Sequence, residues 1–139
     1  MPAPNLTVYE VKAFVPARDF ALSKRFYEAL GFEIPWSSDD LADVRHGNTS
    51  FLLQNFYVQG HAENFLMHLR VQDVDDWREH VRAKRIAAEF GVRVGEPEDQ
   101  PWGLRDFVLF DPSGVLWRVA QTIYRDFPPC QAELVFRRR

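Results

Sequence analysis

The sequence predicts an α+β domain of two paired βαβββ modules that form a curved, eight-stranded cup. Three observations predict it: short segments alternate apolar and polar residues, each half carries one helical segment, and the second half repeats the order of the first. One such module, about 55 residues, is marginal as an independent fold. We therefore expect one domain over residues 1–139, with modules at about 7–56 and 64–122 and an extension at 123–139.

The first module opens with an alternating segment, 7–17, which predicts a strand with two different faces. Asp19 then stands at the position of a helix N-cap, an apolar stripe follows, and Gly31 ends the helix as a C′ glycine does. Further strands are expected at 32–34, 41–45 and 49–54, separated by turns at 37–40 and 46–48.

The second module repeats this order at growing intervals. Asp73 lies 54 positions after Asp19, whereas Gly91 lies 60 positions after Gly31. This increase in the interval between matching positions predicts that the second module has a longer helix and a longer loop, because such places tolerate insertions. Strands are expected at 65–71, 107–110 and 115–121, and 91–94 mirrors the strand that follows the first helix.

Alternation gives each strand an apolar face and a mixed face. The apolar faces are expected beneath the helices, which predicts two small cores, one per module; they comprise Val11, Ala13, Val15, Ala17, Phe65, Met67, Leu69, Val71, Val115, Trp117 and Val119. The mixed face comprises Lys12, Phe14, Leu66, His68, Arg70, Leu116, Arg118 and Ala120. Phe51 joins it because Phe51 and Arg118 each lie four residues beyond a turn glycine, Gly47 or Gly114. Unpaired cations are costly to bury, so we expect this face to line a wet cleft.

Seven residues are candidates for ligand binding: Lys12, Phe14, Trp36, Phe51, His68, Trp102 and Arg118. Trp102 lies between Pro101 and Gly103, outside any apolar stripe, where an indole could stack on a ligand as a lid. Trp36 ends a strand near a turn and is a candidate for the rim of the cleft. Trp77 and Trp117 are instead expected in the core, and His46, His61 and His80 in solvent.

The cations of the mixed face leave two interpretations open. Lys12 and Arg118 could hold an anionic ligand, or they could pair with a carboxylate such as Glu10. His68 could contact a ligand, act as a general base, or serve as a hydrogen-bonded wall residue.

Composition excludes several function classes. The net charge of −3 argues against general nucleic-acid binding, although the chain ends in three arginines, and no apolar stretch reaches the 18 residues of a membrane span. The one cysteine, Cys130, can form neither an internal disulfide nor a thiolate metal site. The first residues show no signal-peptide pattern. We expect a cytoplasmic protein that binds neither nucleic acid nor a membrane.

Two motifs resemble the vicinal oxygen chelate superfamily, in the form found in glyoxalase/bleomycin resistance proteins. They are PARDF…FYEALGF at 16–32 and WGLRDF…DPSG at 102–114. The resemblance covers about residues 7–122. It implies paired βαβββ modules and a homodimer in which modules are exchanged or clefts are shared.

Metal enzymes of this superfamily carry His, Glu or Gln ligands on the first and last strands of each module. The resemblance puts these positions at Lys12, Phe51, Leu66 and Arg118, none of which suits a metal, and a shift of two residues recovers only His68. We therefore expect no cofactor, no metal and no catalysis, but sequestration of an aromatic or anionic small molecule, such as a bleomycin-type antibiotic. Two classes stay open: a metal-dependent glyoxalase-like lyase or isomerase or extradiol dioxygenase, and a dimeric module whose cleft its own side chains fill.

Overall fold

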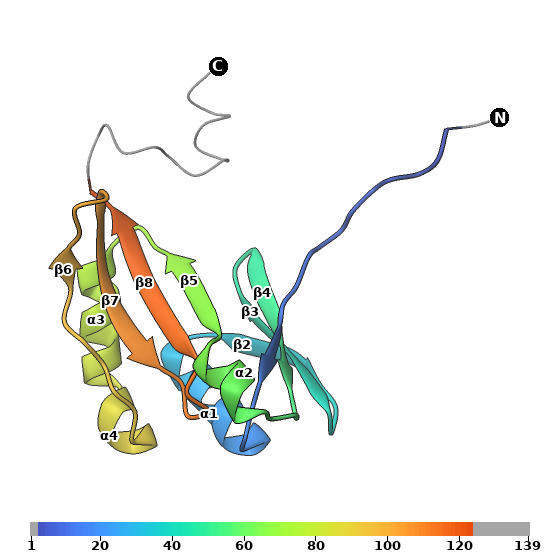
Figure 1. Ribbon diagram of the computed structural model, residues 1–139, viewed down its shortest axis with the longest axis horizontal. Coiled ribbons are helices and arrows are strands. Elements are labelled where there is room, and N and C mark those ends of the chain that lie inside the picture. Colours follow the sequence, from blue (N-terminus) through green and yellow to red (C-terminus); the bar gives the residue numbers. More distant parts are fainter. Residues whose placement is uncertain (1–2, 124–139) are drawn as a thin grey trace.

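The computed structural model describes residues 3–123, which form two four-stranded sheets and four helices (Figure 1). The first module contains β1 (Phe14–Pro16), α1 (Phe20–Leu30), β2 (Glu33–Ser37), β3 (Leu41–His46) and β4 (Thr49–Gln54). After α2 (Gln59–Glu63), the second contains β5 (Leu66–Arg70), α3 (Val74–Ala83), α4 (Ile86–Phe90), β6 (Glu98–Asp99), β7 (Leu104–Phe110) and β8 (Leu116–Thr122). The α+β prediction is confirmed. The expected extension falls almost entirely outside the described residues, as does Cys130.

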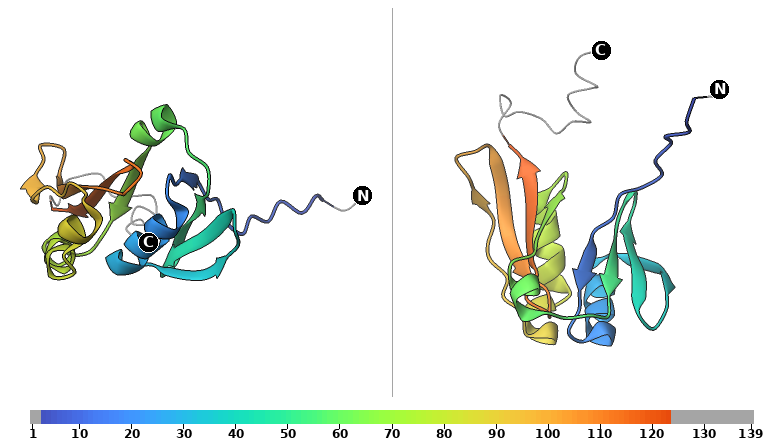
Figure 2. Two further views of the ribbon diagram at one scale, coloured as in Figure 1. Left: turned by 90° about the horizontal axis from the view of Figure 1, so that it is seen from below. Right: turned by 45° about the vertical axis from the view of Figure 1, so that its right-hand side comes forward.

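The two sheets have the same topology, which makes the internal repeat visible. Their strand orders are β1-β4-β3-β2 and β5-β8-β7-β6, and in each the first strand runs parallel to the last. Phe14 pairs with Leu52 in the first sheet, and His68 pairs with Arg118 in the second. The eight strands thus form two separate sheets side by side within the chain, with no closed barrel (Figure 2).

The helix start and stop signals act as predicted. The Asp19 carboxylate accepts a hydrogen bond from the Leu22 N–H at 3.1 Å, and that of Asp73 accepts one from the Asp76 N–H at 2.9 Å. Gly31 ends α1 with a φ of 117°, in the left-handed region that glycine adopts at little cost.

Substitution of the two N-cap residues, Asp19 and Asp73, tests the capping role. Asp19→Ala and Asp73→Ala should each lower the free energy of unfolding by about 1 kcal/mol, because each leaves a backbone N–H of the first helical turn without its acceptor. Urea denaturation followed by circular dichroism measures the change. Asp39→Ala, in an exposed turn, is the control and should stay within about 0.5 kcal/mol of the parent; equal losses in all three variants would contradict the capping role.

The expected longer second helix is two helices. Arg85 has a φ of 54° and separates α3 from α4. A non-glycine residue in the left-handed region cannot continue a right-handed helix, so the inserted residues fold back as a short second segment. Ile86, the first residue of α4, is fully buried.

The core is one cluster that spans both modules, so the prediction of two small cores is wrong. Phe26 of α1 meets Phe90 of α4 with ring centroids 5.4 Å apart. Trp117 of β8 lies 5.7 Å from Tyr27 and 5.5 Å from Phe51, both of the first module. The modules therefore bury their apolar faces against each other as well as beneath their own helices.

The N-terminal segment differs most from its prediction. Only 14–16 pair as a strand, whereas residues 3–13 form an extended arm that leaves the body of the molecule (Figure 1). Val11, expected beneath a helix, is 91% exposed. Alternation gives a segment two faces, but burial needs a neighbouring element, and no residue within 3–123 covers the Val11 side chain.

Candidate functional site

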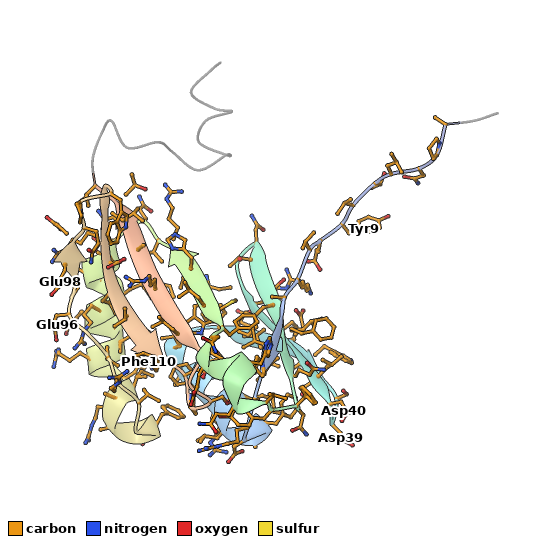
Figure 3. The ribbon with its side chains drawn as sticks, viewed as in Figure 1. Tyr9, Asp39, Asp40, Glu96, Glu98 and Phe110 are labelled. Carbon is orange, nitrogen blue, oxygen red and sulfur yellow. The ribbon has the colours of Figure 1, made fainter. Side chains whose placement is uncertain are left out.

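Each sheet has a face against the helices and a face turned outward, which we call its outer face. Residues paired across neighbouring strands share a face. The pairing places Phe14, Leu52, Asp43 and Trp36 on the outer face of the first sheet. It places His68, Arg118 and Val108 in one row on the outer face of the second sheet, with Asp106 in the next row. Figure 3 shows the side chains around both sheets, with Tyr9 far out on the arm.

The assignment of Phe51 to the mixed face is wrong. Phe51 is 2% exposed and packs on Tyr27 with ring centroids 5.0 Å apart. The turns explain the error: β3 and β4 are joined by the two residues Gly47 and Asn48, whereas five residues join β7 to β8. Alignment on the turn glycine therefore slips by one residue, which moves a side chain to the opposite face. The true counterpart of Arg118 is Leu52, since each pairs with the matching residue of the first strand.

Lys12 is held at the edge of the first outer face by carboxylates. Its Nζ donates to Asp43 Oδ1 at 2.9 Å and lies 3.1 Å from Glu10 Oε2. Arg45 donates to Glu10 Oε1 at 2.9 Å, so the base of the arm is tied to β3. These hydrogen bonds, with Asp43 first, raise the pKa of Lys12, and the bond from Arg45 contributes most to lowering the pKa of Glu10. Glu10 was predicted from the sequence as a possible partner of Lys12, but Asp43 was not.

Arg118 also has a carboxylate partner. Its Nη1 donates to Asp106 Oδ2 at 3.1 Å, and Gln100 donates to Asp106 Oδ1 at 3.0 Å. The Asp106 residue is 3% exposed, whereas the Arg118 side chain keeps 37% of its surface exposed. Asp106 therefore fixes one edge of the guanidinium, while the exposed part can still meet a ligand.

The remaining candidates are exposed but do not converge within one chain. Phe14, Trp36 and Trp102 keep 47%, 53% and 49% of their surfaces exposed. Phe14 and Trp36 lie on edge strands of the first sheet, His68 lies on the second, and Trp102 lies in the turn between β6 and β7. The chain thus presents two separate aromatic and basic surfaces.

Beneath these surfaces lies a buried polar network that the sequence reading missed. The Tyr27 hydroxyl donates to Asp111 Oδ2 at 2.6 Å and accepts from Trp117 Nε1 at 3.0 Å. Burial raises the pKa of Asp111 and, aided by the Asp111 charge, raises that of Tyr27 well above its usual value. The network joins α1 of the first module to the β7–β8 turn of the second.

Two of the histidines expected in solvent have other surroundings. His80 is half-buried, and its Nε2 lies 3.0 Å from the Leu30 carbonyl oxygen, so the expectation for His80 is wrong. His46 is exposed but contacts Phe32 and Trp77, with ring centroids 5.6 and 5.5 Å away. Trp77 is packed against the core and only partly buried.

The donor set of the outer faces is poor in metal ligands. In the corrected register, the paired positions of the first and last strands are Phe14 with Leu52 and His68 with Arg118. His68 alone among these four is a usual metal ligand. Within residues 3–123, no three His, Cys, Asp or Glu residues gather in a way that could hold a metal ion. Nor does any helix in that range have the length and apolar character to cross a bilayer.

Comparison with known proteins places the chain in a family. The model of the Glyoxalase/Bleomycin resistance protein/Dioxygenase superfamily matches residues 11–119. A bleomycin resistance protein of Klebsiella pneumoniae is 30% identical over 112 residues, which cover 77% of this chain and 87% of that protein.

Solved structures agree with that placement. A crystal structure of a bleomycin-binding protein complexed with bleomycin superposes with a TM-score of 0.70 at 25% identity, over 83% of this chain and 99% of the other. The bleomycin-binding protein of the bleomycin producer Streptomyces verticillus, complexed with copper(II)-bleomycin, superposes with a TM-score of 0.66 at 26% identity, over 86% and 100% of the two chains. The chain belongs to the glyoxalase/bleomycin resistance protein/dioxygenase superfamily, and its relatives by sequence and structure include proteins that bind bleomycin.

Proposed function

We propose that this protein binds a bleomycin-type antibiotic, or a similarly aromatic and polar small molecule, and sequesters it without chemistry. The observation that carries the proposal is the pair of outer faces, which expose aromatic and cationic side chains in a chain similar to proteins that bind bleomycin. Aromatic walls with a few fixed polar groups are typical of small-molecule sites.

The cations held in place on the outer faces favour a ligand that accepts hydrogen bonds. Arg118 is fixed on one side by Asp106 and keeps part of its guanidinium exposed. Lys12 is fixed by Asp43 and Glu10 in the same manner. A cation held in place loses less entropy on binding than a free one, so it can hold a carbonyl-rich or anionic group at lower cost.

We propose that the binding unit is a homodimer. One chain leaves large apolar side chains in solvent along the arm and on the outer faces, among them Leu6, Val8, Tyr9, Val11 and Leu66, each at least 57% exposed. Exposed apolar side chains that gather along one segment, as Leu6, Val8, Tyr9 and Val11 do on the arm, mark an interaction site in soluble proteins. A second copy that covers the arm and brings one outer face opposite another would bury these residues and turn two open surfaces into a closed cleft.

The proposal includes no resident metal and no catalytic group, and a cytoplasmic location. The outer-face positions that pair across the first and last strands carry one usual metal ligand, His68. A lone histidine does not hold a divalent ion firmly. A lyase or dioxygenase of the superfamily would need further donors there.

Titration with metal-free bleomycin and with copper(II)-bleomycin tests the binding proposal. We expect saturable quenching of tryptophan fluorescence, with heat on mixing in calorimetry. Trp36→Ala and Trp102→Ala should each weaken binding about tenfold, because exposed aromatic anchors dominate such interfaces. Phe56→Ala is the matched control: Phe56 is 54% exposed but lies in the loop after β4, and its loss should change affinity less than about twofold.

Two outcomes would overturn parts of the proposal separately. No saturable signal with either form of bleomycin would remove the proposed ligand, whatever the oligomeric state. A monomer by sedimentation equilibrium at the concentration of the titration would remove the proposed dimer, whatever the affinity. Tyr9→Asp with Val11→Asp should shift a dimer towards monomer, since both side chains are more than 90% exposed in the isolated chain.

A further inference from the structure

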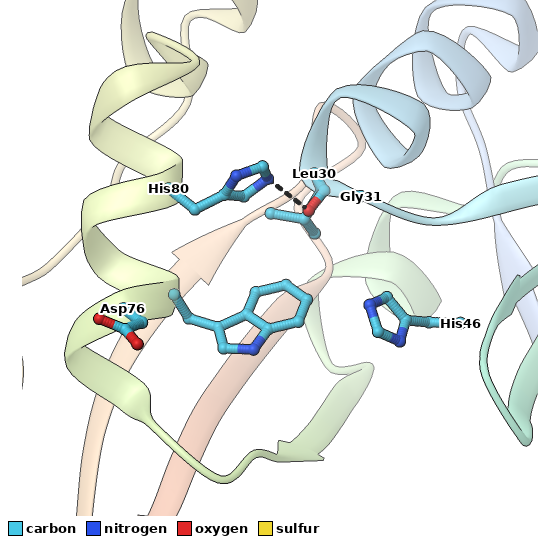
Figure 4. A pocket seen from close by; sticks show the side chains of 6 residues that line it. Leu30, Gly31, His46, Asp76 and His80 are labelled. Carbon is cyan, nitrogen blue, oxygen red and sulfur yellow. Dashed lines mark hydrogen bonds between the residues drawn. The ribbon is translucent and has the colours of Figure 1, made fainter.

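A cavity lies between the two modules, on the helix side of the sheets and away from both outer faces. Its volume is about 270 Å³, and Leu30, Gly31, His46, Asp76, Trp77 and His80 line it. The end of α1 and the end of β3 form one side, and α3 forms the other (Figure 4). The cavity is therefore built by both halves of the repeat.

Three aromatic rings form its walls. The rings of His46 and Trp77 are 5.5 Å apart at 50°, and those of Trp77 and His80 are 6.1 Å apart at 75°. Neither of these ring pairs is stacked in parallel. A planar aromatic guest gains most from such walls, because offset and edge-to-face contacts are both available.

The polar groups of the cavity are few and partly fixed. His80 Nε2 lies 3.0 Å from the Leu30 carbonyl oxygen, which can only accept, so this nitrogen carries a proton and the ring is held in place (Figure 4). Trp117 Nε1–H donates to Tyr27, whereas Trp77 Nε1–H donates to no residue within 3–123. The Asp76 carboxylate points away from His46 (Figure 4). The indole N–H of Trp77 is thus a donor available to a ligand.

A second cavity adjoins the first across the His46–Trp77 contact. Its volume is about 460 Å³, and besides those two rings it is lined by the β3–β4 turn and by 69–72 at the end of β5. Volumes of this size accommodate small organic molecules. The ring of Trp77 is accordingly reachable from two sides.

We propose that this cavity is a second binding site, for a small planar aromatic molecule that carries a hydrogen-bond acceptor. The rings of His46, Trp77 and His80 enclose the flat face of the guest, and Trp77 Nε1–H donates to its acceptor. The site does not use the residues proposed for bleomycin binding, so each can exist without the other.

Nuclear magnetic resonance of the indole N–H groups tests the proposal, with quinoline as the probe. The chain has four tryptophans, so its full-length protein should give four indole N–H signals. We expect quinoline to shift the Trp77 signal saturably, with a Kd of about 1 mM or tighter, and to leave the Trp117 signal in place. Cyclohexanone, an acceptor without an aromatic ring, should bind about tenfold more weakly.

Two variants and one control distinguish binding at this site from nonspecific binding of quinoline elsewhere. Trp77→Leu should remove the shifted signal and, by calorimetry, weaken quinoline binding about tenfold. His46→Ala, at an exposed position where folding is not at risk, should weaken it about threefold, and Phe56→Leu, at an exposed aromatic residue outside both proposed sites, should leave it unchanged. The proposal is overturned if quinoline gives no saturable shift, if cyclohexanone binds equally well, or if Phe56→Leu weakens binding as much as His46→Ala.

Discussion

Asp111→Ala should lower the free energy of unfolding by about 3–5 kcal/mol, one of the two largest effects expected for this chain. The Asp111 carboxylate accepts from the Tyr27 hydroxyl at 2.6 Å, the Ser113 N–H at 2.8 Å and the Val115 N–H at 2.9 Å. Alanine would leave these three buried donors without an acceptor. Urea denaturation at neutral pH, followed by tryptophan fluorescence, measures the loss.

Tyr27→Phe provides the comparison for Asp111. It keeps the ring but removes the hydroxyl that donates to Asp111 and accepts from Trp117 Nε1–H, so it should cost about 1–3 kcal/mol. The two substitutions should not be additive, because both act on the same hydrogen bond; we expect a coupling of at least about 1 kcal/mol in a double-mutant cycle. Additive effects, or a loss for Asp111→Ala of the size found at the surface, would contradict the network.

Trp117→Ala should be equally damaging, at about 3–5 kcal/mol. Trp117 is 2% exposed, its ring packs on Tyr27, Phe32 and Phe51, and its Nε1–H donates to the Tyr27 hydroxyl. Alanine would open a large cavity where the two modules meet. Thermal unfolding and urea denaturation, both followed by circular dichroism, report the change.

The other tryptophans supply the controls for Trp117. Trp102 is 49% exposed, and Trp102→Ala should change stability by no more than about 0.5 kcal/mol. Trp117→Phe keeps most of the packing and loses the hydrogen bond, so its cost should lie between the two. A Trp117→Ala protein as stable as Trp102→Ala would show that the modules do not share a core.

Local signals in the sequence predicted the fold well. Asp19 and Asp73 cap their helices, and Gly31 ends α1, because a cap depends on residues within one turn of it. The buried face of β8 was also predicted, since Trp117 and Val119 alternate with Arg118 along one strand. Such features depend on short-range geometry, which the order of residues determines.

Features that depend on distant contacts were predicted less well. Phe51 was assigned to the wrong face because the length of a turn, and not its glycine, sets the register of a hairpin. Val11 follows the predicted alternation, but no residue within 3–123 covers its side chain. Asp43 and Asp106 could not be assigned to Lys12 and Arg118, because each pair joins residues that only the sheet brings together.

The parallel pairing of the first and last strands in each module also constrains how the chain folds. Phe14 pairs with a residue 38 positions away and His68 with one 50 positions away, so neither sheet closes through local hairpins alone. Closure of long loops comes before the contacts that compensate for it, which slows folding. During synthesis, β5 cannot pair until β8 has been made, and the Tyr27 hydroxyl cannot accept its hydrogen bond until Trp117 has been made. The first half therefore stays partly open until almost the whole domain has been made, and we expect folding to be completed only after β8 is available.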